Sequence, residues 1–441
     1  MKEFLLSELL QIKNGRDYKH LSKGPYPVFG SGGLMQYVDD YLYDKPSILL
    51  PRKGSLTNIQ YADVPFWTVD TLYYTEVDNS KVNAYYLYYY LKQLDLSNLD
   101  SGTGVPSMTF DSYYNIRVSL PPLTEQDRIA ILLQKLDKAV AVKRQINDYL
   151  EAMARQLYDY WFVQFDFPDE SGNPYKSTGG KMVWNDTLKR EIPEGWSNGV
   201  LGDYIGRITN GLNPRSNFIL GNGNNYYITI RSLTGTDIDW DNCDKCDDVA
   251  LRKINSRSQL QIGDIVFSAI GTIGRTYLIQ EQPRNWNISE TSFTLRPTSG
   301  IPSEFLYSLL RSDEIQLLAD KAAMGSTLRC LVMESLKQVP IVLIPEFLTK
   351  RFGGIVKTWY SQIYSLNKQV RELREQRDSI MPLLMNGQVF VKPLNNHLSE
   401  LRILILRYYL CQLTHLPGLS PRNCLLRDSC LFPTPRFLFY Q

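Results

Sequence analysis

Three glycines in one short segment are the first residues that could do chemistry. The segment YPVFGSGG, residues 26–33, places Gly30, Gly32 and Gly33 after an apolar run, as loops that bind phosphates do. A dinucleotide loop has the spacing G-x-G-x-x-G and a P-loop ends in Gly-Lys-Ser/Thr, and neither is present. Pro46 also interrupts the chain before the long helix that such a loop needs could form. We therefore predict a glycine-rich turn between strands, not a cofactor loop.

Metal-dependent, histidine-dependent and methyl-transfer chemistry have little support. Cys243 and Cys246 form a C-x-x-C pair, but no further zinc ligands are evident nearby, so no metal site is expected. The chain has three histidines, too few for most histidine-based hydrolases and nucleases. The tripeptide at residues 173–175, NPY, lacks the second proline of the adenine-methylase loop N-P-P-Y. We therefore expect no catalytic residues and no cofactor bound by this chain.

Length and composition predict a soluble protein of several domains. The chain has 441 residues, enough for about three ordinary domains, and a formal net charge of +2. No apolar run is long enough to cross a membrane, and the six cysteines form no regular framework, which suits a reducing cytoplasm. A polyanionic partner would have to meet local basic patches.

Comparison of the chain with itself indicates an internal repeat. The matching landmarks keep their order, and their separation drifts from 196 to 223 residues, with about 20 extra residues early in the second copy. The matched pairs are Gly15 with Gly211, Gly54 with Gly271, Thr71 with Thr291, Gly104 with Gly325, and Pro122 with Pro345. One unit has been used twice.

Each copy ends in a proline followed by a long heptad pattern, typical of paired helices. The first seam comprises Ile129, Leu132, Leu136, Ala139, Lys143, Ile146, Leu150, Met153, Leu157 and Tyr160. The second comprises Phe352, Val356, Trp359, Ile363, Leu366, Val370, Leu373, Arg377, Ile380 and Leu384. The two cations have long stems that can pair across the helices. The simpler alternative is that each helix packs only on its own domain.

The connectivity predicts how the parts are arranged. A helix of about 33 residues is roughly 50 Å long, so the first helix would carry the chain away from the first unit. If the seams meet, the helices run antiparallel as a coiled coil. The fold class predicted is two mixed α/β units separated by that coiled coil, a pseudo-two-fold dumbbell. Tyrosines between 85 and 90 could stack on bases, but their helical spacing favours a core position.

Several motifs resemble those of one family, the specificity (S) subunits of type I restriction-modification systems. They are YPVFGSGG, SLPPLTEQDRIA at 119–130, GNPYKSTGGKMV at 172–183, IPEGW at 192–196 and the duplicated layout itself. The resemblance implies two target recognition domains that each read one half of a split sequence in double-stranded DNA. It also implies helices that act as a ruler and docking surface for two methyltransferase subunits, which bind S-adenosylmethionine. Restriction subunits would use ATP and Mg.

The resemblance divides the chain into six segments. They are recognition domain 1 at 1–123, a central helix at 124–165, a linker at 166–192, recognition domain 2 at 193–345, a C-terminal helix at 346–391 and an atypical tail at 392–441. The linker is expected to be flexible. The tail departs from the family pattern: it holds three of the six cysteines and two of the three histidines. A recombined or frame-shifted end and a genuine extension both remain open, and such a tail could leave the protein inactive.

Candidate base-reading residues are polar and cationic side chains in loops, which suit major-groove edges. In the first unit they are Asn14, Arg16, Lys19, Arg52, Lys53, Ser55, Thr57 and Asn58, with the turn SGTGVPS at 101–107. In the second they are Arg231, Ser232, Thr272, Arg275, Ser326, Thr327 and Arg329. Neither unit is basic overall: residues 1–120 hold 11 Lys+Arg against 13 Asp+Glu, and 200–345 hold 14 against 15. A coiled-coil scaffold that binds proteins is the main competing interpretation, and an enzyme in its own right is the second.

Overall fold

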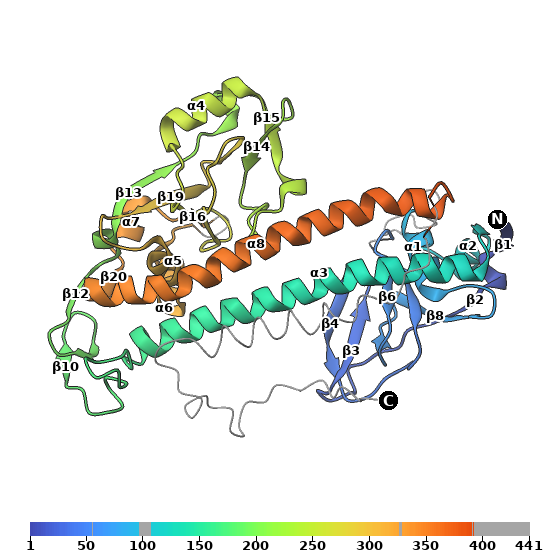
Figure 1. Cartoon of the computed structure of the whole chain (residues 1–441), viewed down its shortest axis with the longest axis horizontal. Coiled ribbons are helices and arrows are strands. Elements are labelled where there is room, and N and C mark those ends of the chain that lie inside the picture. Colours follow the sequence, from blue (N-terminus) through green and yellow to red (C-terminus); the bar gives the residue numbers. More distant parts are fainter. Residues whose placement is uncertain (55, 97–106, 326–328, 390, 392–441) are drawn as a thin grey trace. The chain divides into compact units, whose positions relative to one another are not determined.

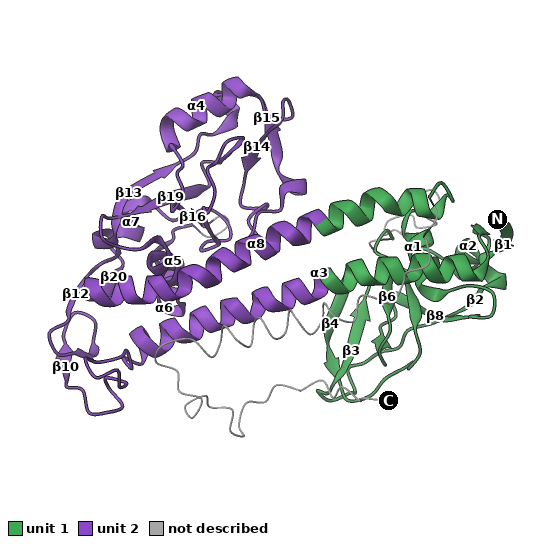
Figure 2. Cartoon of the chain, viewed as in Figure 1, with its two compact units in different colours: residues 1–139, 373–441 green, residues 140–372 purple. Residues whose placement is uncertain are grey.

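The computed structural model describes residues 1–54, 56–96, 107–325, 329–389 and 391. Strands and helices are mixed throughout, as predicted, and the chain forms two compact units (Figure 2). Unit 1 combines residues 1–139 with 373–441, and unit 2 comprises residues 140–372. The tail expected at 392–441 lies outside the described residues.

Unit 1 contains three small sheets (Figure 1). Strand β1 (Lys2–Leu5) pairs with β9 (Arg117–Leu120), and both are antiparallel. A second sheet has the order β2 (Leu10–Lys13), β8 (Leu72–Val77), β5 (Ser47–Pro51), β6 (Gln60–Ala62). The third has the order β4 (Gly33–Val38), β3 (Tyr26–Gly30), β7 (Trp67–Thr68), with β3 and β7 parallel.

Two short helices complete the globular part of unit 1. They are α1 (Ala84–Lys92) and α2 (Phe110–Tyr114). The Asn83 side chain caps α1 by accepting the backbone N–H groups of Tyr85 and Tyr86, both at 3.0 Å. Tyr86 and Tyr89 are buried in the core beside β2 and β5 residues. The tyrosine cluster is therefore core, as its spacing indicated.

Unit 2 contains the same three kinds of sheet and one extra hairpin. The two-stranded sheet is β12 (Ser197–Val200) with β20 (Pro340–Leu343). The four-stranded sheet has the order β13 (Ile205–Asn210), β19 (Ser292–Pro297), β16 (Ile265–Ser268), β17 (Thr276–Leu278). The three-stranded sheet has the order β15 (Asp244–Cys246), β14 (Asn225–Ile228), β18 (Trp286–Ile288), and β14 is parallel to β18. The hairpin is β10 (Met182–Asn185) with β11 (Arg190–Pro193).

The helices of unit 2 pack beside these sheets. They are α4 (Asp248–Ser258), α5 (Ser303–Arg311), α6 (Asp313–Ala322) and α7 (Met333–Lys337). Helix α5 follows β19 as α1 follows β8 in unit 1. Helix α4, in contrast, lies between β15 and β16, where unit 1 connects β4 to β5 without a helix. It accounts for much of the extra length in the second copy.

The segment expected to be a flexible linker is folded instead. Phe167 is buried, and its ring stacks on Tyr175 at 4.7 Å and on Trp196 at 4.9 Å between centroids. Asp166 accepts hydrogen bonds from the backbone N–H and the hydroxyl of Ser177, at 2.7 and 2.6 Å. The aromatic residues hold the segment against unit 2, and its glycines and polar residues concealed that packing from sequence reasoning.

Two long helices occupy the regions of the heptad patterns. Helix α3 (Leu123–Tyr158) begins in unit 1 and ends in unit 2, and a π-helical turn (Asp159–Val163) follows it. Helix α8 (Glu346–Met385) begins in unit 2 and ends in unit 1. Both predicted seam cations pair across the helices: Lys143 donates to Gln369 at 2.5 Å, and Arg377 to Asp137 at 2.7 Å.

The seam residues differ in how deeply they are buried. In α8, the buried members are Val356, Ile363, Leu366 and Val370, while Trp359 and Leu373 are half-buried. In α3, only Leu150 is buried, while Leu132, Leu136, Ile146, Met153 and Leu157 are half-buried. The most buried row of α3 is Leu133, Val140, Asn147 and Ala154, one residue beyond the predicted second row. Because α3 packs on the sheet units as well as on α8, its buried face is rotated from the apolar stripe that the heptad pattern indicated.

Candidate nucleic-acid interface

The GSGG segment forms the turn between β3 and β4 in unit 1. Gly30 and Gly33 face each other across the hairpin, and Gly33 has a φ of +120°, a conformation that favours glycine. The predicted turn between strands is confirmed. The backbone of the turn is also tied to the next loop, because Asn58 donates its side-chain N–H to the Ser31 carbonyl at 2.7 Å.

A hollow of about 810 Å³ lies beside this turn in unit 1. Its lining comes from three loops that are far apart in the sequence: Asp17, Tyr18 and Lys19; Gly30 through Met35; and Val69, Asp70 and Thr71. Leu34 and Met35 are about half exposed, so apolar and charged groups meet at its rim. An open hollow with a mixed rim suits an extended polar ligand better than an enclosed small molecule.

Several candidate residues of unit 1 gather around this hollow. Lys19 lines it, and Arg52 donates to the Asp70 carbonyl at 3.3 Å while remaining half-exposed. Asn58 reaches the hollow through Ser31. The other described candidates, Asn14, Arg16, Lys53 and Thr57, are exposed. Ser55 and residues 101–106 of the SGTGVPS turn lie outside the described residues.

The candidates of unit 2 also come together, through the loop after β16. The Arg275 guanidinium donates to the carbonyls of Ile230 and Leu233 at 3.0 and 2.9 Å, which places it beside Arg231. The Gly271 N–H donates to the Arg329 carbonyl at 2.8 Å. Thr272 is exposed in the same loop.

Three predicted readers of unit 2 are poorly placed for contact with bases. Ser232 is fully buried, so its hydroxyl cannot reach a ligand. Arg275 uses its side chain to hold a turn, and Arg329 is paired with Asp320 at 2.5 Å. Their types suggested readout, but local packing and ion pairing occupy them. Arg231 is the open cation: its side chain is 80% exposed, with Asp244 at 3.9 Å. Ser326 and Thr327 lie outside the described residues.

The loops that carry these candidates have the same backbone frame in both units. In unit 1 the N–H groups of Arg52 and Lys53 donate to the Thr71 carbonyl, at 2.9 and 3.3 Å. In unit 2 the N–H groups of Ala269 and Ile270 donate to the Thr291 carbonyl, at 2.9 and 3.2 Å. The threonines are a pair matched in the sequence comparison. Each unit therefore presents its variable loops from an equivalent position.

Sequence reasoning missed a group of cations on and beside α4. Arg252, Lys253 and Arg257 are exposed on this helix, and Arg207 of β13 donates to the Arg257 carbonyl at 3.2 Å. The available signal was segregation of charge, because residues 205–224 and 249–263 hold five Lys+Arg and no Asp or Glu. Counting charge over the whole unit concealed it.

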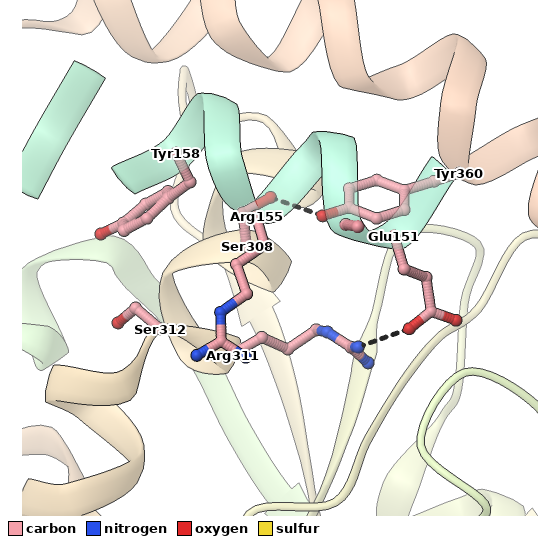
Figure 3. Close-up of a pocket in the computed structure, with 8 residues that line it drawn as sticks. Glu151, Arg155, Tyr158, Ser308, Arg311, Ser312 and Tyr360 are labelled. Atoms are coloured by element: carbon pink, nitrogen blue, oxygen red, sulfur yellow. Dashed lines mark hydrogen bonds and ion pairs between the residues drawn. The ribbon is translucent and has the colours of Figure 1, made fainter. Parts of the chain in front are cut away.

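A second hollow, of about 280 Å³, lies in unit 2 where α3 and α8 meet α5 and α6 (Figure 3). Arg311 points toward Glu151 and pairs with it at 2.9 Å, and the hydroxyls of Ser308 and Tyr360 are 2.8 Å apart. Arg155 at its edge pairs with Asp313 at 2.5 Å. Since these polar groups satisfy one another, the hollow is a structural junction between helices.

The C-x-x-C pair is part of a core. Cys246 is fully buried and Cys243 nearly so, and burial raises the pKa of both thiols. Among the described residues, no three His, Cys, Asp or Glu side chains gather as metal ligands. Nor does any helix in the described ranges have the length and apolar character needed to cross a bilayer.

Comparisons with known proteins agree with this geometry. Residues 1–152 match the family model described as type I restriction modification DNA specificity domain. The chain is 24% identical over 362 residues to the type I restriction enzyme MjaIX specificity subunit of Methanocaldococcus jannaschii, covering 80% of each chain. It is 23% identical to the type I restriction enzyme HindI specificity subunit of Haemophilus influenzae, over 66% of this chain and 72% of that one.

A solved structure supports the fold. The type I restriction-modification system S subunit from M. genitalium superposes with a TM-score of 0.56, at 17% identity, over 89% of this chain and 96% of that one. The resemblance seen in the sequence motifs is therefore confirmed.

Proposed function

Because this chain is related over most of its length to specificity subunits of type I restriction enzymes, we propose that it selects the DNA sequence on which such a complex acts. The observation that carries the proposal is the equivalent frame of Thr71 and Thr291. It supports two recognition domains that hold different loops in the same way. Each domain then reads one half of a split target in double-stranded DNA.

The long helices suit the role of a spacer between the two readers. In this proposal α3 and α8 form an antiparallel coiled coil, and the molecule is a pseudo-two-fold dumbbell whose domains contact half-sites a fixed distance apart. The ion pair of Arg377 with Asp137 and the contact of Lys143 with Gln369 support such a pairing. The outer faces of the helices would dock two methyltransferase subunits, and restriction subunits would join the complex in the cytoplasm.

The chain is the non-catalytic subunit, since the relatives above are named specificity subunits of restriction enzymes. Methylating a base requires a pocket for the flipped nucleotide and a site for S-adenosylmethionine, which the methyltransferase partner would supply. ATP and Mg would act in the restriction partner. The residues of this chain bind, orient and space the DNA.

Methyl transfer tests the proposal directly. The full chain would be incubated with labelled S-adenosylmethionine and genomic DNA, with and without its methyltransferase partner, and methylated adenines would be mapped. We expect methylation only when both proteins are present, at one split sequence. Methyl transfer by this chain alone, or a partner that methylates the same sites without it, would overturn the proposal. A protein-binding scaffold would change no methylation pattern.

A further inference from the structure

We propose that α4 and the adjoining end of β13 bind the phosphodiester backbone of duplex DNA, giving unit 2 a sequence-independent anchor that unit 1 lacks. This inference rests on the proposed function and adds a contact surface to it. The surface, called the α4 basic face below, consists of Arg207, Arg215, Arg252, Lys253 and Arg257.

Helix α4 buries one face and leaves its cations on the other. Ala250, Leu251 and Ile254 are buried in a small core with Tyr227 and Cys246. The opposite positions are exposed and recur at helical spacing: Val249, Arg252, Lys253, Ser256 and Arg257. Packing of the inner face therefore fixes three positive charges on the outer face, where no acidic residue stands among them.

Hydrogen bonds join α4 to the segments beside it. Arg257 donates from Nε and Nη2 to the Asn210 side chain, at 3.1 and 2.7 Å. Lys253 donates to the Asn217 carbonyl at 3.1 Å, in the loop that carries Arg215. Arg207 reaches back to the Arg257 carbonyl. The five cations thus belong to one connected surface and not to separate loops.

No carboxylate neutralises this surface within the described part of the chain. None of its five cations forms an ion pair there, whereas other arginines of unit 2, such as Arg296 with Asp264 and Arg371 with Asp237, are paired at 2.7 Å. The hydrogen bonds of the α4 basic face go to neutral amides and carbonyls, so the positive charge is retained. Unpaired cations on a rigid helix suit phosphate oxygens.

The corresponding connection in unit 1 has the opposite charge. Residues 39–46, between β4 and β5, form no helix and contain three aspartates and one lysine. Phosphate contacts supply most sequence-independent affinity for DNA. We therefore infer that unit 2 contributes more of the salt-dependent binding than unit 1, although the two have similar net charge.

The test compares salt dependence in two matched variants of the full chain, each assembled with its methyltransferase partner. Arg252→Gln with Lys253→Gln removes two charges from the α4 basic face. Lys176→Gln with Lys189→Gln removes two exposed charges from the folded segment before unit 2's sheets. Binding to a target duplex and to a random duplex would be measured between 50 and 200 mM salt, the range over which phosphate contacts are resolved.

We expect the α4 variant to lower the slope of log affinity against log salt by about 1.8, near 0.9 for each phosphate contact, on both duplexes. The control variant should keep the wild-type slope. An unchanged slope in the α4 variant would overturn this inference, and so would lost assembly with the partner, which would mark a protein interface. Absence of target preference in the wild-type complex would instead refute the proposed function.

Discussion

Asn147 of α3 donates its side-chain amide to the Oδ1 atom of Asn367 of α8, at 2.6 Å, inside unit 2. Asn147 is 5% exposed and belongs to the most buried row of α3, between Val140 and Ala154. A buried amide pair among apolar residues favours one register, because any shift leaves both amides without partners. The Asn367 amide nitrogen also faces the Thr236 carbonyl at 3.5 Å, so the pair links both helices to the globular part of the unit.

Removal of either amide should destabilise unit 2. We expect Asn147→Ala to lower the free energy of unfolding by about 1–3 kcal/mol, because it leaves a buried polar group of Asn367 unpaired. Asn367→Ala should cost a similar amount, and the double variant less than the sum of the two. Urea unfolding of the four proteins measures the coupling. Additive losses would show that the two side chains do not interact.

Two glycines matched in the sequence comparison should be equally intolerant of a side chain. A Cβ at Gly15 would lie 2.1 Å from the Val69 carbonyl oxygen, and one at Gly211 would lie 1.8 Å from that of Ile288. We expect Gly15→Ala and Gly211→Ala each to lower stability by about 1–3 kcal/mol, since the backbone must move. Gly32→Ala is the matched control, because nothing lies within 4 Å of its Cβ position. Thermal unfolding would distinguish them, and an unaffected Gly211→Ala variant would contradict the close approach.

Much of the fold was accessible from the sequence because its signals are local or repeated. The GSGG turn follows from glycine chemistry, and α1 and α5 follow from apolar spacing. The rotation of the α3 face was not accessible, because Asn147 and Ala154 are buried by partners that only the tertiary structure supplies. The folded segment around Phe167 escaped prediction for the same reason.

The candidate site was less predictable than the fold. Residue type alone marked Arg275 and Ser232 as readers, yet carbonyl partners hold the first and burial removes the second. Lys19 and Asn58 do meet at one hollow, since loops that leave neighbouring strands at the same edge come together. The charge of the α4 basic face required knowing which segments lie side by side.

Exchange of one unit should alter one half of the DNA target. We expect replacement of residues 200–345 by those of a related specificity subunit to change one half of the methylated sequence and to leave the other half unchanged. The reason is that the loops of each unit hang on a frame of their own, at Thr71 or at Thr291. Mapping of methylated adenines checks this. A change in both halves would refute independent reading.

The buried thiols should react slowly in the folded protein. Burial raises the pKa of Cys243 and Cys246, so at pH 8 less of each is thiolate than in the unfolded chain, and reactivity should rise as the pH increases. Alkylation with iodoacetamide, followed by peptide mass spectrometry, should label the half-buried Cys330 first. Unfolding in guanidinium should abolish the difference. Faster labelling after addition of a chelator would contradict this account, since it would reveal a metal bound to the pair.

The helix pair should set the distance between half-sites, and the structure dictates how to test this. An insertion in α3 alone would separate Asn147 from Asn367 by a heptad, so seven residues must be added to both helices, after Ile146 and after Leu366. One heptad adds about 10 Å, or about three base pairs of rise. We expect the double insertion to lengthen the unread spacer by about that amount, as measured by methylation mapping. The insertion after Ile146 alone is the control and should reduce activity, because it breaks the register. Methylation by the double-insertion protein at the original spacing would rule out the helices as a ruler.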